Sequence, residues 1–451
     1  MALVEGVVLF GAAYLGFWTS YLEWPATFGK YFVPAALFAI TLVFSMVAMG
    51  VYESRVREGW LGMMLRTLVS IFLLGGMLIA ISSYVYPPIA IGRGALFFSV
   101  LEGFIGITML RWLASTLIDE SALKTDVIVL GSGKQANIVA TRMRRRSDQR
   151  GFNLRGFISM PGEKDQITGH GARVYQLDSS LKKFCQLHNV DEVVVALDDR
   201  RGGALPLDEL LDCRLSGINV CELQAFIERE ANKLDVDLLN PSWLVFSDGF
   251  ITGSWRSFNK RAFDIAASIG LLFTTWPLAI LACLSVWIAS GFKGSVITSQ
   301  QRVGYDGVLF TLRKIRSMNV DAEEDGRPQW AELNDPRITR VGKVLRKSRI
   351  DELPQLLNVL KGEMSFVGPR PERPEFVTQL CNDIPFYDHR HRIKPGITGW
   401  AQLCYPYAAS ASDAKEKLNF DLYYLKNHSL MLDLAILLQT VEVVLVGEGV
   451  R

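Results

Sequence analysis

The sequence lacks an excess of charge of either sign, because 48 lysine and arginine residues stand against 46 aspartate and glutamate residues in 451, a net charge of +2. This balance excludes a protein that binds nucleic acid mainly through its net charge, and it excludes an acidic disordered chain. Only six cysteines occur, with no Cys-x-x-Cys pair and no histidine at zinc-finger spacing. We therefore expect reduced cytoplasmic thiols rather than a disulfide framework or a structural zinc site.

The first apolar segment lacks both a basic region before it and a small-residue cleavage site after it, so we expect an anchor rather than a removed signal peptide. Hydrophobicity, in contrast, is abundant, at 49% of the residues with a mean hydropathy of +0.20. Four windows approach the roughly 20 residues that cross a bilayer: Gly6–Leu22, Tyr31–Tyr52, Thr67–Val85 and about Ala95–Leu113. We predict a four-helix transmembrane bundle over residues 1–118.

Basic residues around these windows predict the orientation of the bundle. More cations lie between the second and third windows and after the fourth than in the other two loops. The first group is Arg55, Arg57, Arg66, Arg111 and Lys124, and the second is Lys30 and Arg93. Because basic loops stay on the cytoplasmic side, both ends of the bundle should face the cytoplasm. The rest of the chain should then lie in the cytoplasm, beside a membrane that the bundle crosses several times.

Residues 119–250 alternate short β-branched runs with amphipathic stretches, which predicts a parallel, Rossmann-like α/β domain. Its first run leads into a G-x-G-x-x-A turn formed by Gly131, Gly133 and Ala136. Such glycines let a backbone approach a phosphate held at a helix N-terminus. The acidic residue that would hold a ribose about twenty positions later is missing. The turn therefore fits either a nucleotide loop or a structural or regulatory domain.

The third part, residues 251–451, opens with Lys260, Arg261 and Asp264, followed by an uncharged stretch, 265–292, that contains Pro277. Its length permits one membrane crossing. Proline removes a helix hydrogen bond and kinks the helix, so a segment that enters the membrane and returns to the same side is also allowed. If the sequence on both sides is cytoplasmic, the second interpretation follows, with a re-entrant helix over about 262–292.

Most residues suited to chemistry fall between positions 301 and 402. Asp351 and Glu352 are adjacent carboxylates just before a helix that starts with proline, a pattern that alone indicates a solvated helix start. Here, however, cations precede them and a rigid Pro369-Arg370-Pro371 triplet follows; the preceding cations are Lys314, Arg316, Arg346 and Arg349. Proline on both sides fixes a guanidinium that could grip a diphosphate. The combination favours phosphoryl transfer with a divalent metal.

Eight motifs in this region occur in order: Lys260-Arg-x-x-Asp264, Gln301-Arg-Val-Gly304, Arg316-Ser-Met318, Asn334-Asp-Pro-Arg-Ile-Thr-Arg340, Asp351-Glu-Leu-Pro-Gln-Leu356, Asn358-Val-Leu-Lys-Gly362, Gly368-Pro-Arg-Pro371 and Lys394-Pro-Gly-Ile-Thr-Gly-Trp-Ala-Gln402. Together they resemble the bacterial sugar transferases known as monotopic polyprenol phosphate phosphoglycosyl transferases. The whole chain resembles the long form of that family. The resemblance implies four N-terminal transmembrane helices, a Rossmann-like middle domain and a mainly α catalytic domain with a re-entrant membrane helix.

The resemblance also implies the reaction. A hexose 1-phosphate moves from a UDP-sugar, UDP-glucose or UDP-galactose, to undecaprenyl phosphate, and UMP is released, which initiates exopolysaccharide, capsule or O-antigen synthesis. Asp351 would be the nucleophile that carries the phosphosugar, and Glu352, with Asp351, would bind Mg²⁺. The matching substrate-binding positions are Lys314, Arg316, Arg346, Pro369, Arg370, Pro371 and Asp421. The partners would be the two substrates and the lipid bilayer, and a homodimer is compatible with the added domain.

Two other functions are weighed beside this one. A membrane-anchored nucleotide-sugar epimerase or dehydratase would need a Tyr-x-x-x-Lys pair and a ribose-binding acid, and neither follows Gly131. A non-enzymatic nucleotide-sensing scaffold would be indifferent to substitution of Asp351. Finally, His389 and His391 could face a metal, but no third ligand is evident, and the interleaved Arg390 favours a basic surface.

Overall fold

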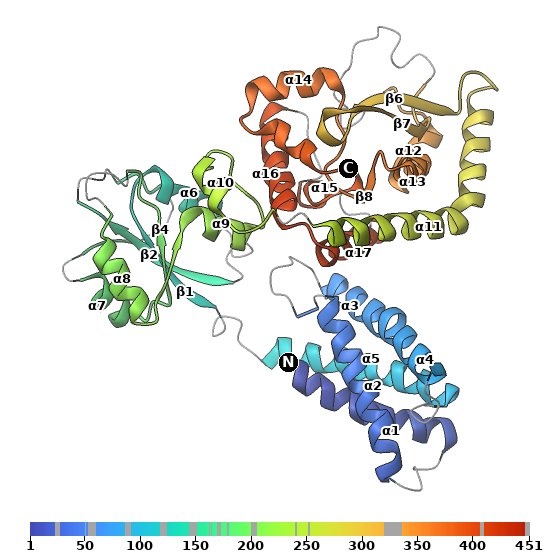
Figure 1. The fold of residues 1–451 in the computed structure, drawn as a ribbon, viewed down its shortest axis with the longest axis horizontal. Coiled ribbons are helices and arrows are strands. Elements are labelled where there is room, and N and C mark those ends of the chain that lie inside the picture. Colours follow the sequence, from blue (N-terminus) through green and yellow to red (C-terminus); the bar gives the residue numbers. More distant parts are fainter. Residues whose placement is uncertain are drawn as a thin grey trace. The chain divides into compact units, whose positions relative to one another are not determined.

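The computed structural model describes residues 1–22, 28–49, 51–52, 60–85, 92–117, 124–143, 151–161, 163, 165–168, 173–177, 180–199, 205–239, 241–250, 253–319, 336–405 and 410–446. Its elements are labelled in Figure 1. The chain divides into two compact units. One holds residues 110–240, and the other holds the N-terminal helices together with residues 241–451.

The N-terminal part consists of apolar helices, which confirms the prediction of four. They are α1 (Ala2–Tyr21), α2 (Phe28–Ala48), a continuous third helix made of α3 (Trp60–Leu68), the π-helix η1 (Val69–Gly75) and α4 (Gly76–Val85), and α5 (Arg93–Leu117). Each contributes a fully buried side chain to one core: Leu9, Leu42, Ile71 and Ile107. Because each helix buries only part of its circumference and stays apolar elsewhere, the bundle suits a lipid environment.

The basic residues used for the orientation lie in different places. Arg55 and Arg57 fall outside the described residues. Arg66 and Arg111 lie within α3 and α5 and are buried, with 2% and 7% of their surface exposed, so they do not stand in loops. The cytoplasmic orientation therefore stays a prediction.

The middle unit contains a five-stranded parallel sheet with helices, as predicted. Its elements are β1 (Thr125–Leu130), α6 (Lys134–Arg142), β2 (Phe152–Ser159), β3 (Val174–Gln176), α7 (Leu181–Leu187), β4 (Glu192–Val195), α8 (Leu207–Leu215), β5 (Asn219–Glu222) and α9 (Leu223–Ala231). The strand order is β3-β2-β1-β4-β5. Because β1 is central, Val127 and Val129 enter the core on one face while Ile128 and Leu130 enter the core on the other. A strand buried on both faces reads as a continuous apolar run.

The C-terminal part, residues 241–451, is termed the catalytic part after the resemblance; it is mainly helical, with two small two-stranded sheets. Its elements are α10 (Pro241–Phe246), α11 (Ser254–Ala289), β6 (Ile297–Val303), η4 (Tyr305–Gly307), β7 (Leu309–Ile315), α12 (Arg340–Lys347), η5 (Ile350–Gln355), α13 (Leu356–Lys361), β8 (Ser365–Val367), α14 (Pro374–Asp383), η6 (Tyr387–Arg392), β9 (Gly396–Thr398), α15 (Trp400–Cys404), α16 (Ala411–Asn427) and α17 (Leu430–Val446). Of the eight motifs, only the one that begins at Asn334 starts outside the described residues. Helix α10 belongs with this part, since the ring of Trp243 lies 4.1 Å from the Lys426 ammonium.

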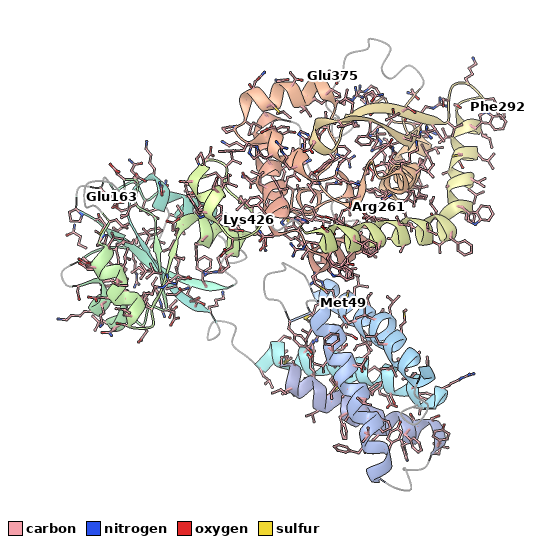
Figure 2. All side chains as sticks on the ribbon, viewed as in Figure 1. Met49, Glu163, Arg261, Phe292, Glu375 and Lys426 are labelled. Carbon is pink, nitrogen blue, oxygen red and sulfur yellow. The ribbon has the colours of Figure 1, made fainter. Side chains whose placement is uncertain are left out.

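The first half of α11 is fastened to the catalytic part by its basic and acidic residues. Lys260 Nζ lies 2.7 Å from the Asp433 carboxylate. The Arg261 guanidinium donates to the carbonyls of Val359 and Leu360, at 2.6 and 2.7 Å, and so caps the last turn of α13. Figure 2 shows Arg261 on the first half of α11. The Lys-Arg pair of the Lys-Arg-x-x-Asp motif therefore has a structural reason. Its two side chains contact a carboxylate and two backbone carbonyls of the catalytic part.

Asp264 completes this attachment one turn later. Its carboxylate is 3% exposed and accepts hydrogen bonds from the Ser365 hydroxyl at 3.0 Å and from the Phe366 N–H at 2.9 Å. Figure 1 shows that α11 then turns sharply part way along its 36 residues, and Pro277 lies inside it. Past the proline, Ala282 and Val286 pack in a core with Ile315 and Leu345. Both halves of α11 thus contact the same catalytic part.

Candidate active site

The adjacent acids Asp351 and Glu352 lie at the start of η5, a 3₁₀ turn entered through Arg349 in the left-handed conformation (φ 57°). A solvated helix start would leave such side chains exposed. Instead, Asp351 is 6% exposed and Glu352 is 7% exposed. Burying two carboxylates side by side is unfavourable unless positive charge surrounds them. The cations around the pair therefore decide what each acid can do.

Glu352 is held by three cations. Its Oε1 lies 3.1 Å from Lys314 Nζ, at the end of β7, and 3.3 Å from Arg370 Nη2. Its Oε2 lies 3.7 Å from Arg349 Nη1. Burial alone would raise the pKa of Glu352, but Lys314, Arg370 and Arg349 together lower it to about 2. Glu352 is consequently a fixed negative charge at any physiological pH.

Asp351 is less firmly paired. Its Oδ1 is buried and has no hydrogen-bond partner among the residues that the structure describes. Burial raises the pKa of Asp351, and the neighbouring Glu352 raises it further, while Lys314, Arg346 and Arg370 act in the opposite direction. An uncommitted carboxylate oxygen with cations nearby is the arrangement that a nucleophile needs.

The loop that presents Arg370 is held through three consecutive carbonyl groups. The Gly396 N–H donates to the carbonyl of Pro369 at 2.9 Å, and the Arg390 guanidinium donates to that of Arg370 at 3.0 Å. The Arg302 guanidinium donates to the third, of Pro371, at 3.2 Å. With its backbone bonded on each side, Arg370 can meet a diphosphate without first paying much entropy for ordering.

Glycines bring the two motifs of this loop together. Strands β8 and β9 pair in parallel, and they place Gly368 against Gly396 and Gly399. A Cβ built on Gly396 would overlap the backbone nitrogen of Gly368, and one on Gly399 would overlap the carbonyl oxygen of Gly368. The Gly-Pro-Arg-Pro and Lys-Pro-Gly-Ile-Thr-Gly motifs are therefore two sides of one close backbone contact.

The structure does not bring every predicted substrate residue to the acids. Lys314 and Arg346 lie close enough to lower the pKa of Asp351, and their binding of substrate stays a prediction. Arg316, in contrast, is 7% exposed and donates to the Lys293 carbonyl at 3.0 Å, in the segment that follows α11. Its observed contact fastens that segment instead of the acids.

Asp421 is also placed away from the acids. It is 2% exposed and lies 2.8 Å from Arg390, which also donates to the Tyr387 hydroxyl at 2.6 Å. Arg390, with 5% of its surface exposed, is therefore not part of a basic surface. Sequence reasoning missed its role, since nothing local distinguishes it from Arg392. Through Arg390, which donates to the Arg370 carbonyl, Asp421 supports the loop that presents Arg370.

The acids fit a magnesium ion that is bound together with a diphosphate. No group of three or more His, Cys, Asp or Glu residues with metal-ligand geometry occurs in the part of the chain that the structure describes. Mg²⁺, however, is commonly held by one or two carboxylates plus substrate phosphates. The free Oδ1 of Asp351 and the ionised Glu352 could supply those protein ligands.

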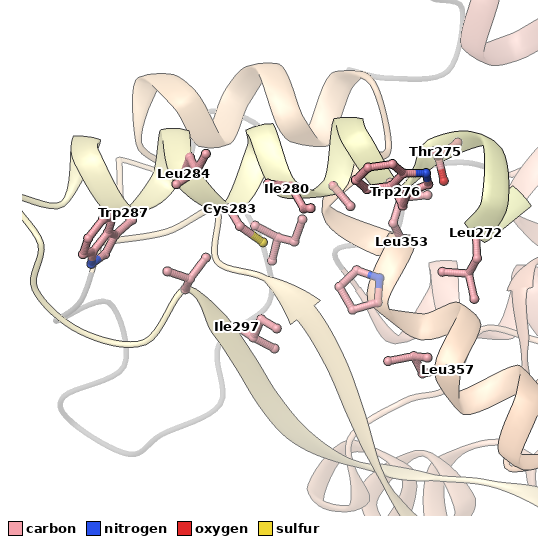
Figure 3. Close-up of a pocket in the computed structure, with 14 residues that line it drawn as sticks. Leu272, Thr275, Trp276, Ile280, Cys283, Leu284, Trp287, Ile297, Leu353 and Leu357 are labelled. Carbon is pink, nitrogen blue, oxygen red and sulfur yellow. The ribbon is translucent and has the colours of Figure 1, made fainter.

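Two cavities adjoin the acids and α11. A cavity of about 710 Å³ includes Arg349 and Glu352 in its wall. A second, of about 470 Å³, is lined almost entirely by apolar side chains. Figure 3 shows Trp276, Ile280 and other α11 side chains of this second cavity across from Leu353 and Leu357. Both cavities include Thr275 and Leu353, so α11 and the turn after Glu352 form a wall of each.

The glycine turn of the middle unit is filled by carboxylates of the protein itself. At the N-terminus of α6, the N–H groups of Lys134 and Gln135 both donate to Asp198, at 2.8 Å. The Ser132 N–H donates to Glu163 at 2.9 Å. A Cβ on Gly133 would overlap the Asp198 carboxylate. The backbone amides in the turn of Gly131, Gly133 and Ala136 thus donate to carboxylates of the protein itself. Binding of a nucleotide there stays a prediction.

Comparison with known proteins connects this site to a family. Residues 255–447 match the family model described as bacterial sugar transferase. An undecaprenyl-phosphate glucose phosphotransferase of Komagataeibacter xylinus is 30% identical over 80% of this chain and 70% of its own length. A UDP-N-acetylgalactosamine-undecaprenyl-phosphate N-acetylgalactosaminephosphotransferase of Aeromonas hydrophila is 41% identical over 54% of the chain, and the match spans 56% of that relative. An undecaprenyl-phosphate galactose phosphotransferase of Salmonella typhimurium is 40% identical over 43% of the chain and 41% of its own length.

Proposed function

The chain belongs to the bacterial sugar transferase family, and from this premise we propose that it transfers a hexose 1-phosphate from a UDP-sugar to undecaprenyl phosphate and releases UMP. We propose UDP-glucose or UDP-galactose as the donor, and the initiation of exopolysaccharide, capsule or O-antigen synthesis as the role. The observation that carries the proposal is the buried acid pair: Asp351 has an uncommitted oxygen, and Glu352 beside it is ionised among three cations.

In the first step, an oxygen of Asp351 forms a bond to the β-phosphorus of the UDP-sugar. The bond between that phosphorus and the bridging oxygen breaks, and UMP leaves with the bridging oxygen. Lys314 and Arg370 neutralise the charge of the diphosphate, since both reach the space beside the acids. Mg²⁺, held by Glu352 and Asp351 with the diphosphate, would supply further charge neutralisation.

In the second step, a phosphate oxygen of the lipid forms a bond to the same phosphorus. The bond between that phosphorus and Asp351 breaks, and the carboxylate is regenerated. The product carries the sugar through a diphosphate, so each step exchanges one phosphorus–oxygen bond for another and needs no further reactant. Splitting the transfer in this way keeps the two anionic substrates from having to occupy the site together.

The acceptor is a membrane lipid, so the position of the acids relative to the bilayer matters. We propose that α11 enters the membrane, bends at Pro277 and returns to the side it came from. The support is that Asp264, before the proline, and Val286, after it, both contact the catalytic part. A helix that crossed a bilayer of about 30 Å would place its two ends on opposite sides. The catalytic part would then face the cytoplasm of a bacterial inner membrane.

The middle unit is proposed to be a Rossmann-like domain, on the basis of its parallel strands and their order. Its glycine turn is occupied by Asp198 and Glu163, which supports a structural or regulatory role over catalysis. A homodimer is also part of the proposal. The alternative of a non-enzymatic nucleotide-sensing scaffold is disfavoured, because such a protein does not require two buried acids surrounded by cations.

The test is UMP release by the purified full-length protein with Mg²⁺ and undecaprenyl phosphate. The donors are UDP-glucose, UDP-galactose and UDP-N-acetylgalactosamine, each offered alone. We expect lipid-dependent release from one donor, and a loss of roughly 10³-fold or more in the Asp351→Asn variant, which keeps the shape of the side chain but not the nucleophile. Asp383→Asn, an exposed acid at the end of α14, is the matched control.

Two results would overturn the proposal. If folded protein released no UMP from any donor, the scaffold function would be favoured. If Asp351→Asn retained the wild-type rate while a donor was consumed, another residue would have to be the nucleophile.

A further inference from the structure

The cavity of about 710 Å³ next to the acids combines two chemically different kinds of lining. Its wall is mostly apolar, and includes Leu271 and Leu278 of α11 and Val443 of α17. Arg349 and Glu352 are the charged residues of that wall. A mostly apolar cavity that also has a charged pair fits an amphipathic ligand better than a sugar nucleotide, which is polar along its whole length.

Arg349 is the one cation in the wall of this cavity among the residues that the structure describes. Lys314 and Arg370, which also contact Glu352, do not line it. The two oxygens of Glu352 separate these cations: Lys314 and Arg370 lie at Oε1, at 3.1 and 3.3 Å, and Arg349 lies at Oε2. The charged groups around the acids therefore form two sets.

The Arg349 guanidinium is also less engaged than the others. Its distance to Glu352 is 3.7 Å, longer than a hydrogen bond, and its side chain is 38% exposed. Its left-handed backbone conformation, φ 57°, is unfavourable for a residue with a long side chain. A loosely paired guanidinium in the wall of a mostly apolar cavity can turn toward an incoming phosphate at little cost.

We propose that Arg349 binds the phosphate of the lipid acceptor, and that the cavity between α11, α17 and η5 holds the first part of its apolar chain. This inference rests on the proposed function, because it assigns the second of the two substrates. Lys314 and Arg370 serve the donor diphosphate from the Oε1 side of Glu352, and Arg349 serves the acceptor from the Oε2 side. Separate cations let the lipid phosphate approach after UMP has left, without displacing the residues that held the donor.

The half-reactions separate the two roles experimentally. Without acceptor, the first step and its reverse exchange labelled UMP into the UDP-sugar, and this exchange needs Asp351 but no lipid. The variants are Arg349→Asn, which tolerates a left-handed conformation and so limits misfolding, and Arg349→Lys, which keeps the charge. Lys347→Gln, two positions earlier and exposed, removes one positive charge outside the cavity and is the control.

We expect Arg349→Asn to raise the KM for undecaprenyl phosphate by roughly 10- to 100-fold, the range for losing one charge-assisted contact. Exchange of UMP and the KM for the UDP-sugar should change far less. Arg349→Lys should recover part of the lost affinity, and Lys347→Gln should resemble wild type. A purely structural role for Arg349 would instead reduce exchange and lipid transfer together.

The inference is overturned if the KM for the lipid is unchanged in Arg349→Asn, or if exchange falls in parallel with transfer. Absence of exchange in the wild type, with overall transfer intact, would overturn the covalent mechanism first. It would then remove the basis for dividing the cations between two steps. The two failures are thus distinguishable in one set of measurements.

Discussion

Replacing Glu352 with glutamine tests whether the acid pair depends on one fixed negative charge. The amide has nearly the same shape, so packing changes little. The charge balance changes strongly, because Lys314 at 3.1 Å and Arg370 at 3.3 Å lose the carboxylate oxygen between them. The Glu352 side chain is 8% exposed, so water replaces little of what is lost.

The magnitude follows from the burial of these groups. Removing one partner of a buried ion pair costs about 3–5 kcal/mol. The cations remain partly solvated, with 22% of the Lys314 side chain and 36% of the Arg370 side chain exposed, so we take the lower limit of about 3 kcal/mol. If the lost interaction is needed in the transition state, the rate of UMP release should fall roughly a hundredfold. A role in holding Mg²⁺ would add to this loss.

The pH dependence of activity in the same variant tests independently whether the charge of Glu352 affects Asp351. Asp351 must be ionised to attack, and its pKa is raised by burial and by Glu352, so activity should fall on the acid side at a higher pH than for an ordinary aspartate. In Glu352→Gln the repulsion is absent, and Lys314 and Arg370 are no longer neutralised. Both changes lower the pKa of Asp351, so the acid limb should move to lower pH even though the rate is smaller.

The assay is the initial rate of UMP release across pH at saturating donor, with thermal denaturation of each variant to show that it is folded. Glu363→Gln, a carboxylate that bonds Asn358 away from the acids, is the control. A rate within about threefold of wild type would refute the electrostatic reasoning, because it corresponds to less than about 0.7 kcal/mol. An acid limb that stayed in place would refute the coupling between the two acids.

Two further predictions concern the parts that support the site. Asp264→Ala leaves the Phe366 N–H and Ser365 hydroxyl without their acceptor and should lower the free energy of unfolding by roughly 3 kcal/mol; denaturation in detergent should show a clear loss, while Asp264→Asn, which retains an acceptor oxygen, loses less. Asp198→Ala removes the acceptor of two α6 amides and should destabilise the middle unit by about 1–2 kcal/mol. High phosphate should offset part of that second loss, which the exposed Asp208→Ala control should not show, and equal phosphate effects in both would contradict it.

Local patterns in the sequence were sufficient for the apolar helices and the parallel sheet. Hydropathy over about 20 residues predicts the N-terminal helices because lipid selects composition directly. The run around Val127 predicts a strand buried on both faces for the same kind of reason, since alternation disappears when both faces are covered. The acid pair could also be predicted, because its cations and its rigid arginine lie within a short part of the chain.

Contacts between distant segments could not be predicted in this way. Asp198 caps α6 from 64 positions beyond Lys134, and Arg390 meets Asp421 although β9 and α15 lie between them in the chain. Neither pair has a period or spacing that singles it out. The resemblance grouped Arg316 and Asp421 with the acids, but their observed contacts are with Lys293 and Arg390. The fold determines which charged residues face the acids. The sequence shows only that these residues lie close together along the chain.

The opposite pKa directions of the two acids indicate a division of roles that adjacency alone would not give. Both side chains are buried to nearly the same extent, so burial does not distinguish them. The cations do: Glu352 contacts three and its pKa falls to about 2, whereas Asp351 forms no ion pair within the described part of the chain and its pKa rises. Glu352, which stays ionised, is suited to binding a metal and to holding the cations. The residue whose oxygen is uncommitted and more basic suits the attack on phosphorus, because basicity and availability are what a carboxylate nucleophile requires.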